Sequence, residues 1–431
     1  MNTPAARELV TSINGREVGA LREQGNLWSF HYAQSWIDAA DAYDLAPNLA
    51  RADVNIIDGA TLRPVQWFFD NLLPEKEARE TLSTEAKLLS SDAFGLLEYY
   101  GRESAGAITL TTRGVTLPAA AYQPLDDAEL HRRIVNRPRR SLMADAPKKM
   151  SNAGAQDKLA VVVRGNELFQ PVGDAVSTHL LKPDHIDREH YHDTVANEYF
   201  VMRLAARLGL DVPAVSMRFV PDPVYLIERF DRATMNGTIQ RTHVIDACQL
   251  LGIDREFKYR LAAVDSLVRC VELCENRARA RQSLLELALF NVLTGNSDAH
   301  LKNISFRVGP GGIHIAPFYD LLSTESYNTS PGSQGSWPNA EITTPLGVAR
   351  RFAQVNRHEF REFAAALGVT ATAANRVAHQ FTEKIERAAD EIIAEFEALT
   401  FPSPTVRAGQ LRVLATIRKI IIREMAAKLS R

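Results

Sequence analysis

Apolar and polar residues alternate over short stretches in the first half of the chain. Residues 8–23 (ELVTSINGREVGALRE) contain two such stretches around Asn14 and Gly15, which predicts a β-hairpin. Residues 157–172 (DKLAVVVRGNELFQPV) predict a strand, a turn at 164–166 and a second strand. A third short strand is expected in VSTHLLK, residues 176–182. This half of the chain is therefore expected to be rich in β-structure.

Helical spacing of apolar residues dominates the rest. TVANEYFVMRLAARLGL (194–210) predicts a helix that ends at Gly209, and strands are expected in 212–220 and 223–230. From residue 243 onwards the pattern is almost entirely helical, interrupted by a hairpin predicted within 303–320. The expected fold class is α+β, with a β-rich N-terminal part, a helical C-terminal lobe and a cleft between two lobes. The expected domains are 1–130, a connector 131–149, a β-rich lobe 150–240 and a helical lobe 241–431.

Composition narrows the functional classes. The chain has 431 residues, 45% of them hydrophobic and 24% charged, with a formal net charge of −2. This balance indicates a globular protein without a global basic field for nucleic acid or membranes. The local basic run 131–149 is interpreted as a solvated connector, with DNA contact as the alternative. No basic segment followed by an apolar run opens the chain, so a cytoplasmic protein without a membrane contact is expected.

Two of the three cysteines, Cys270 and Cys274, stand one helical turn apart. They could hold zinc, but no matching Cys/His pair follows, which favours reduced thiols on a helix.

The nonapeptide GNSDAHLKN, residues 295–303, concentrates reactive side chains between an apolar helix and the predicted hairpin. Asp298 stands five residues before Asn303, which is the spacing of a protein-kinase catalytic loop, and Asp320 lies past the hairpin, where a metal-binding aspartate is expected. Phosphoryl transfer needs one carboxylate for the attacking hydroxyl, and a second carboxylate and a carboxamide for Mg²⁺. The alternative is a polar turn in which these side chains bond local amides.

Phosphate contacts are expected from the β-rich lobe. GxxxxGK[ST] is absent, so a Walker-type loop is excluded, but the small residues of SNAGAQDK (151–158) could approach phosphates closely. Lys182 could reach phosphates or be a surface lysine on an edge strand. By kinase analogy Glu198 could pair with that lysine, or it could face solvent. The candidates for the adenine contact lie in LIERFDR and are Glu228, Arg229 and Phe230. Phe230 could equally be a core residue.

SNAGAQDKLAVVV, STHLLKP, NEYFVMRLAARLGL, YLIERFDR, DACQLLG and GNSDAHLKNISF…FYDLLST together resemble the HipA family, the serine/threonine kinase toxins of bacterial toxin–antitoxin modules. The stretches VGALRE…FHYAQSWI and FFDNLLPE…FGLLEYYGRESAGAITL look like the N-terminal subdomain of that family. The resemblance implies a kinase-like fold with ATP and Mg²⁺, Asp298 as the catalytic aspartate, and Asn303 and Asp320 as metal ligands. The nucleotide contacts that it implies are Ala153, Gly154, Ala155, Gln156, Asp157, Lys158, Lys182, Glu228, Arg229, Phe230, His300, Lys302 and Tyr319.

Ser151 matches the serine that family members phosphorylate on themselves. A phosphate there adds roughly 1.5 to 2 negative charges to the loop expected to hold ATP, which would act as a brake. Asn152 departs from the aliphatic residue that often follows this serine, and FYDLL lacks the glycine of a DFG motif, as in the family. The segment 326–347 is expected to be a loop, with no role assigned.

The leading prediction is a protein kinase toxin that inhibits translation by phosphorylating an aminoacyl-tRNA synthetase, the glutamyl enzyme being the first choice. The resemblance also implies a helix-turn-helix antitoxin, HipB-like, which brings the kinase to operator DNA. One alternative is a kinase-fold co-repressor scaffold without phosphoryl transfer. The other is a small-molecule phosphotransferase, which uses a similar Asp, Asn, Asp set.

Overall fold

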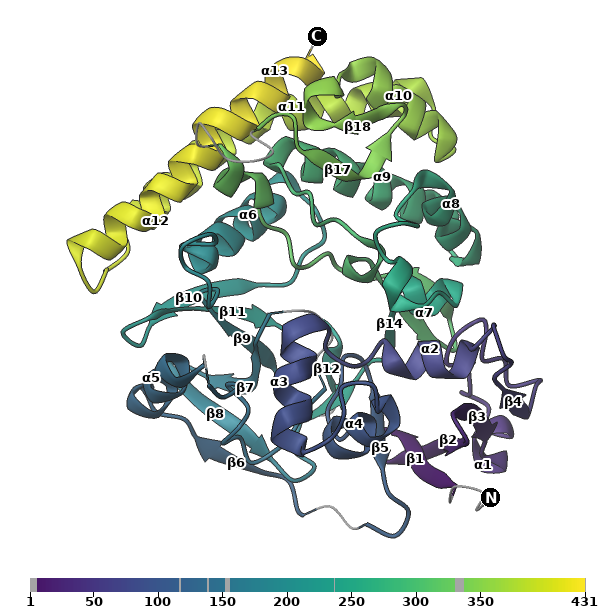
Figure 1. Ribbon diagram of the computed structural model, residues 1–431. Helices are drawn as coiled ribbons and strands as arrows, with labels where there is room; N and C mark the ends of the chain where they lie inside the picture. Colours follow the sequence, from purple (N-terminus) through teal and green to yellow (C-terminus); the bar gives the residue numbers. More distant parts are fainter. Residues whose placement is uncertain are drawn as a thin grey trace. The chain divides into compact units, whose positions relative to one another are not determined.

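The computed structural model describes residues 6–115, 118–137, 139–151, 156–235, 237–329 and 337–430 (Figure 1). The nucleotide contacts predicted at Ala153, Gly154 and Ala155 lie outside these residues. The chain divides into two compact units. Unit 1 comprises Met1–Lys182, Glu228–Phe257 and Ser305–His314, and unit 2 comprises Pro183–Ile227, Lys258–Ile304 and Ile315–Arg431.

Unit 1 begins with an antiparallel five-stranded sheet in the order β4-β3-β2-β1-β5. The hairpin predicted at Asn14 and Gly15 is confirmed, because both residues have positive φ, 48° and 78°, as a two-residue turn between twisted strands requires. Alternate residues of β3 are buried, so one face of the sheet carries the core. The strands are β1 Arg7–Ile13, β2 Arg16–Gln24, β3 Leu27–Tyr32, β4 Asn55–Ile57 and β5 Ile108–Thr111.

Short helices cover this sheet and bury large aromatic side chains such as Phe69 and Phe94. The Asp58 carboxylate accepts hydrogen bonds from the amides of Val65 and Gln66 and so satisfies donors at the start of α2. The helices are α1 Gln34–Ile37, α2 Pro64–Asp70, α3 Lys76–Ala86 and α4 Ala93–Tyr100.

A second set of strands in unit 1 is arranged in the order β6-β8-β7-β9. The predicted strand–turn–strand is confirmed, with Gly165 at φ 59° in the turn, and so is the third strand. These strands are β6 Ala121–Pro124, β7 Leu159–Arg164, β8 Glu167–Val172 and β9 His179–Pro183.

The basic run 131–149 is not an open connector. Its first residues complete helix α5, Asp127–Asn136, and Arg133 is buried against Glu129 and Gln170. Arg132 and Arg140 both pair with Asp145. Asp145 and the preceding Glu129 therefore offset part of the positive charge of the run, which weakens the DNA-contact alternative.

The remaining described parts of unit 1 are two small sheets, a short α-helix and a 3-10 turn. The hairpin predicted within 303–320 is confirmed as β15 and β16, which continue a sheet begun by β14. The hairpin of β12 and β13 was not predicted. The elements are β12 Arg232–Met235, β13 Thr238–Arg241, β14 Val244–Asp246, α7 Ala247–Leu251, η1 Arg255–Phe257, β15 Ser305–Gly309 and β16 Gly312–Ile315.

Unit 2 is mainly helical. The helix predicted at 194–210 is α6 Thr194–Leu208, closed by Gly209 at φ 92°, and the antiparallel strands β10 Val215–Phe219 and β11 Pro223–Glu228 follow it. α6 packs against α11 and α12, and α11 also packs against α13 (Figure 1, α6 in teal and α11 to α13 in green to yellow). The other helices are α8 Val264–Leu273, α9 Arg277–Thr294, η2 Leu301–Asn303, η3 Thr324–Asn328, η4 Phe352–Gln354, α10 Arg357–Ala366, α11 Ala371–Glu397, α12 Pro404–Thr416, the π-helical turn η5 Ile417–Ile422 and α13 Arg423–Ser430.

The predicted fold class is confirmed: strands dominate the N-terminal half and helices the C-terminal half. The loop expected at 326–347 is partly wrong, because an antiparallel strand pair, β17 Glu341–Leu346 and β18 Ala349–Arg351, begins within it. All three cysteines are buried, and none of them forms a disulfide bond. Within the described residues, no helix is both long and apolar enough to cross a bilayer.

Candidate functional site

The loop 295–303 starts where the buried helix α9 ends. Gly295 closes that helix with φ 66°, and a Cβ built there would stand 2.9 Å from the Ile421 side chain. A glycine is therefore required both by the backbone angle and by the space. The turn directs the chain abruptly out of the helix, and Asp298 follows three residues later.

Two buried carboxamides hold the main chain of this loop. Asn296 Nδ2 donates to Asn291 Oδ1 at 3.0 Å, and Asn296 Oδ1 accepts from the Asp298 amide at 3.0 Å. Both asparagines are buried. Because a buried amide group is costly to leave unpaired, this chain of bonds fixes the backbone at Asp298.

Two segments that follow this loop in the chain also hold it in place. The Ser297 hydroxyl bonds to Thr324 Oγ1 at 2.8 Å and donates to Glu325 Oε1 at 2.6 Å. From β17, the Thr343 hydroxyl donates to the Ser297 carbonyl, and the Thr344 hydroxyl reaches the Ala299 carbonyl at 3.4 Å. The segment left without a role in the sequence analysis thus supports the predicted catalytic loop.

The Asp298 side chain meets an aromatic pair. Tyr259 Oη donates to Asp298 Oδ1 at 2.5 Å, and the Tyr259 ring meets the His300 ring edge-on, with centroids 4.9 Å apart. Asp298 is half-buried, whereas His300 is buried. A carboxylate held at one oxygen and accessible to solvent is suited to orient an incoming hydroxyl.

The proposed metal side chains lie close to this loop. Asn303 Nδ2 donates to the Asp298 carbonyl at 2.9 Å, which fixes the carboxamide plane. Asp320 has φ 58°, a left-handed conformation that a non-glycine residue adopts at a cost of about 1–3 kcal/mol. The hydroxyl of the preceding Tyr319 donates to the Lys302 carbonyl at 2.9 Å. The neighbouring residue thus ties Asp320 to the same loop.

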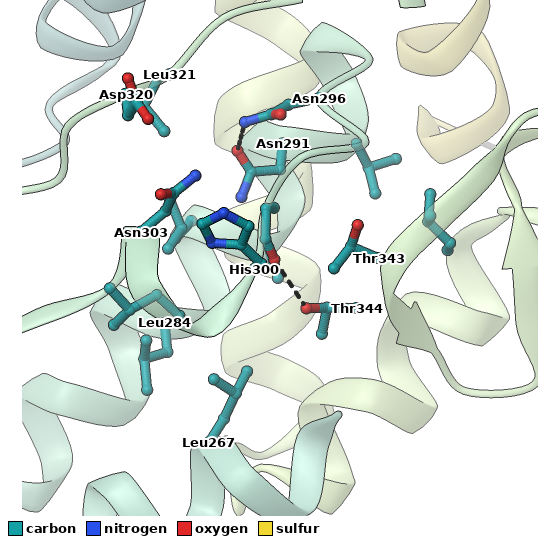
Figure 2. A pocket seen from close by; sticks show the side chains of 16 residues that line it. Leu267, Leu284, Asn291, Asn296, His300, Asn303, Asp320, Leu321, Thr343 and Thr344 are labelled. Atoms are coloured by element: carbon teal, nitrogen blue, oxygen red, sulfur yellow. Dashed lines mark hydrogen bonds between the residues drawn. The ribbon is translucent and has the colours of Figure 1, made fainter. Parts of the chain in front are cut away.

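Asn303 and Asp320 line one pocket, together with His300 (Figure 2). The pocket has an apolar wall from α8 and α9, including Leu267 and Leu284, and Thr343 and Thr344 complete it. Asp298 is not part of its described lining. The structure therefore brings three predicted residues together around one pocket and places Asp298 on the same short loop.

Burial supports a functional interpretation of Glu198 as well. Its side chain is only 4% exposed, so the alternative that it faces solvent is wrong. Burial, and then the negative charges of Glu198 and Asp320, raise the pKa of the Tyr225 hydroxyl well above its usual value. Glu198 and Asp320 therefore both lie near Tyr225 in unit 2.

In unit 1 the predicted phosphate contacts differ in exposure. Lys182 is 5% exposed, which excludes the surface-lysine alternative. Gln156, Asp157 and Lys158 are half-buried. Asp157 accepts a hydrogen bond from the Leu142 amide at 2.9 Å, and burial raises its pKa to about 6. As nucleotide contacts these four residues stay predictions.

The three predicted adenine contacts behave differently from one another. Glu228 is exposed and Phe230 is half-buried, so the latter is not plain core. Arg229 is buried, and its guanidinium donates to Asp231, Glu103 and the Ser104 carbonyl. Its amide and carbonyl are used by Thr178 and Arg232. The geometry therefore argues against Arg229 as a nucleotide contact and assigns it to a buried ion network.

Ser151 is fully buried. Its amide donates to the Glu103 carbonyl at 2.7 Å, and its hydroxyl lies 3.5 Å from the same oxygen. Phosphorylation of this hydroxyl would require the segment to leave that position.

The oxygen donors fit the metal expected for phosphoryl transfer. Mg²⁺ prefers hard oxygen ligands and keeps several waters, so one carboxylate and one carboxamide are an adequate protein contribution. Asp320 supplies the carboxylate, and the Asn303 carboxamide is oriented through its nitrogen. Among the described residues, no group of three or more His, Cys, Asp or Glu side chains is arranged to hold a metal.

Sequence reasoning missed Tyr259, Asn291 and Thr343. Asn291 lies in an apolar helix, where a lone carboxamide facing the core is the only local signal. Nothing in the sequence around Tyr259 or Thr343 indicated a role for either residue in the site.

Comparisons with known proteins identify the family of the chain. Residues 9–111 match the model of the HipA N-terminal domain, and residues 150–389 match the HipA-like C-terminal domain, more than half of the chain. The chain belongs to the HipA family. It is therefore a member of a family of serine/threonine kinase toxins.

Two curated relatives and one solved structure show how far this likeness extends. The serine/threonine-protein kinase toxin HipA of Shewanella oneidensis is 32% identical over 76% of this chain and 77% of its own. A putative kinase of Sinorhizobium fredii, Y4mE, is 36% identical over 73% of this chain and 76% of its own. The HipA of the Shewanella oneidensis complex with HipB and operator DNA matches 97% of this chain and 99% of its own, at TM-score 0.78 and 26% identity. The resemblance to the HipA family and the two-lobed kinase-like fold are confirmed.

Proposed function

We propose that this HipA-family chain transfers the γ-phosphoryl group of ATP, with Mg²⁺, to serine or threonine hydroxyls of a protein. One observation carries the proposal: Asp298 and Asn303 lie on one loop and are joined by a 2.9 Å hydrogen bond, while Asn303 shares a pocket with Asp320. These are the oxygen donors that phosphoryl transfer requires.

Each residue has a defined role in this proposal. Asp298 accepts the proton of the attacking hydroxyl and orients it, with Tyr259 holding its Oδ1. Asn303 and Asp320 would hold Mg²⁺, which when bound neutralises charge on the phosphates. Lys182 and residues 153–158 contact phosphates, and Glu228 and Phe230 contact adenine. His300, Lys302 and Tyr319 shape the nucleotide side of the loop.

The substrate and partners are proposed from the family. We expect an aminoacyl-tRNA synthetase as the target, with the glutamyl enzyme tested first, so that phosphorylation inhibits translation. The solved neighbour is a complex of HipA with HipB and operator DNA, which supports a HipB-like antitoxin that recruits this chain to DNA. The antitoxin would read the base sequence, since Arg132, Arg133 and Arg140 of the basic run 131–149 are paired within the chain.

Autophosphorylation at Ser151 is proposed as a brake. Because this hydroxyl is fully buried, we expect the modification to be slow and to displace the adjoining segment. A phosphate beside residues 153–158 would then repel the phosphates of ATP. If a phosphorylated Ser151 form bound ATP as tightly as the unmodified chain, the brake would not exist.

The decisive experiment is transfer of radiolabel from [γ-³²P]ATP with Mg²⁺ by the purified chain, alone and with a panel of aminoacyl-tRNA synthetases. Label on one synthetase, lost in Asp298→Ala, is the expected result. ATP binding without any transfer would favour the co-repressor scaffold. Transfer to aminoglycosides or homoserine but to no protein would favour the small-molecule phosphotransferase.

A further inference from the structure

Glu103 lies in the loop between α4 and β5 and is 0% exposed. Four cationic side chains among the described residues surround its carboxylate: Lys148 at 3.0 Å, Arg229 at 3.1 Å, Arg232 at 2.9 Å and Arg241 at 3.0 Å. The Ser177 hydroxyl donates to the same carboxylate at 2.9 Å. A buried carboxylate with this many partners is held in a single position.

Several partners of Glu103 adjoin the proposed nucleotide contacts of unit 1, whereas Arg241 lies in β13. Lys148 and Ser151, whose amide donates to the Glu103 carbonyl, precede the proposed phosphate contacts Gln156, Asp157 and Lys158 in the sequence. Ser177 stands just before β9, which carries Lys182. Arg229 lies between the proposed adenine contacts Glu228 and Phe230.

The same loop is joined to the 229–232 segment at further points. The Ser104 carbonyl accepts from Arg229 at 2.7 Å, and the Gly106 amide donates to Asp231 at 2.7 Å. Gly106 has φ 76°, and a Cβ built there would stand 2.6 Å from the Val244 carbonyl oxygen. The close approach of the Gly106 backbone to Val244 therefore depends on glycine.

We propose that Glu103 is a positioning residue for nucleotide binding: its carboxylate and carbonyl hold three separate segments of unit 1, at 148–151, 177–182 and 228–232, in the arrangement that binds ATP. A residue of the N-terminal module, which has no proposed contact with substrate, then sets the nucleotide affinity of the kinase. This inference rests on the proposed ATP-dependent function.

Charge balance explains why the carboxylate cannot be replaced by a neutral group. Glu103 and Asp231 face Lys148, Arg229, Arg232 and Arg241, two carboxylates against four cations. Burial raises the pKa of Glu103, but the surrounding cations outweigh it and hold that pKa well below its usual value. Without the Glu103 charge, Lys148 and Arg241 would repel the other cations in a poorly screened interior, and the segments that carry them would separate.

The test compares Glu103→Gln, which keeps the shape and removes the charge, with the matched control Asp58→Asn. Asp58 is also a buried carboxylate of the N-terminal module, but its described partners are the amides of Val65 and Gln66, distant in sequence from the nucleotide segments. Mg·ATP affinity is measured by calorimetry on the full chain, below the melting temperature of every variant. Steady-state kinetics then separate KM for ATP from kcat.

For Glu103→Gln we expect both Kd and KM for ATP to rise at least about tenfold. This rise corresponds to a fraction of the free energy that a broken buried charge network can cost. At saturating ATP, kcat should stay within about twofold of the wild-type value. Asp58→Asn should lower the melting temperature while Kd stays unchanged. Hydrogen exchange should rise at 156–160, 177–182 and 228–230 in Glu103→Gln but not in the control. Glu103→Asp, which keeps the charge, should restore most of the affinity.

Lys148→Gln keeps the proposal testable if Glu103→Gln does not fold. This substitution removes one of the surplus cations and leaves Glu103 paired with three arginines, so the charge network should remain stable. It also breaks the ion pair that attaches the segment before Ser151 to Glu103. We expect ATP affinity to fall several-fold in a folded protein. Wild-type affinity in Glu103→Gln or, if that variant is unfolded, in Lys148→Gln would overturn the inference and leave the kinase function standing. Failure of the wild-type chain to bind Mg·ATP would overturn both.

Discussion

Tyr259 Oη donates a 2.5 Å hydrogen bond to Oδ1 of Asp298, although the two residues are 39 positions apart. The phenol ring also lies edge-on to His300, so it contacts the loop at two points. One oxygen of the proposed catalytic carboxylate therefore has a fixed direction before any substrate arrives. Preorganisation of this kind reduces the reorientation needed in the transition state.

Replacing Tyr259 by Phe tests that relationship. We expect kcat to fall about tenfold, because a hydrogen bond to a charged group contributes roughly 1.5–3 kcal/mol and only part of this acts in the transition state. KM for ATP should not change, and the melting temperature should stay within about 2 °C because Tyr259 is 40% exposed. Tyr99→Phe, a similarly exposed tyrosine at 42%, is the control. Wild-type kcat in Tyr259→Phe would show that the bond has no catalytic role.

Asp298→Ala should lower phosphoryl transfer by about 10²- to 10⁴-fold, the range expected when a positioned acid–base group is removed. Because Asp298 is half-buried, the unfolding free energy of the Asp298→Ala protein should differ little from that of the wild type. Transfer assays and thermal melts of this variant beside Asp265→Ala, an exposed aspartate of α8, measure both effects. Equal loss of activity in the two variants would contradict the assignment.

Asp320 allows the metal role to be separated from backbone strain. Asp320→Asn removes the charge and retains a residue that tolerates φ 58°, so the Mg²⁺ concentration for half-maximal activity should rise about tenfold or more with the fold intact. Asp320→Gly should show the same metal defect but equal or higher stability, by up to about 1 kcal/mol. A Mg²⁺ titration of each variant gives the result. Unchanged metal dependence in both would point to a different ligand.

Thr343→Val tests whether β17 supports the catalytic loop. The substitution keeps the shape but removes the hydroxyl that binds the Ser297 carbonyl. We expect a loss of about 1 kcal/mol in unfolding free energy and a several-fold fall in kcat, because the loop loses one of its fixed points. Thr382→Val removes a hydroxyl bonded within helix α11 and is the control. It should leave kcat unchanged, and equal kcat in both variants would rule out a support role.

His243 should make the chain acid-sensitive. Burial lowers its pKa to about 4, and it donates to the Leu45 carbonyl at 2.8 Å as a neutral ring. Between pH 6.5 and about 4 the unfolded chain binds this proton and the folded chain does not, so stability falls as the pH falls through this window. The loss is on the order of 1.5 kcal/mol from pH 6.5 to 5. Urea unfolding of His243→Gln over this range should show a correspondingly flatter profile; an identical slope would remove His243 as the cause.

Local patterns in the sequence determined several of the strands and helices and the position of the chemically reactive loop. The Asn14–Gly15 hairpin, the helix closed by Gly209 and the spacing of Asp298 and Asn303 depend on backbone angles and short periods that neighbouring residues set. Such features are properties of a few consecutive residues, so they can be read without knowing the fold.

Only the tertiary structure decided what supports that chemistry. Tyr259 and Thr343 reach the loop from 39 and 46 residues away, and the burial of Lys182 and Ser151 depends on elements packed around them. Glu103 meets partners up to 138 positions distant. No local spacing specifies such pairs, because they form only when packing and desolvation bring remote segments together. The sequence by itself therefore determined which residues carry the proposed chemistry, and the packing of the chain decided which residues hold them in place.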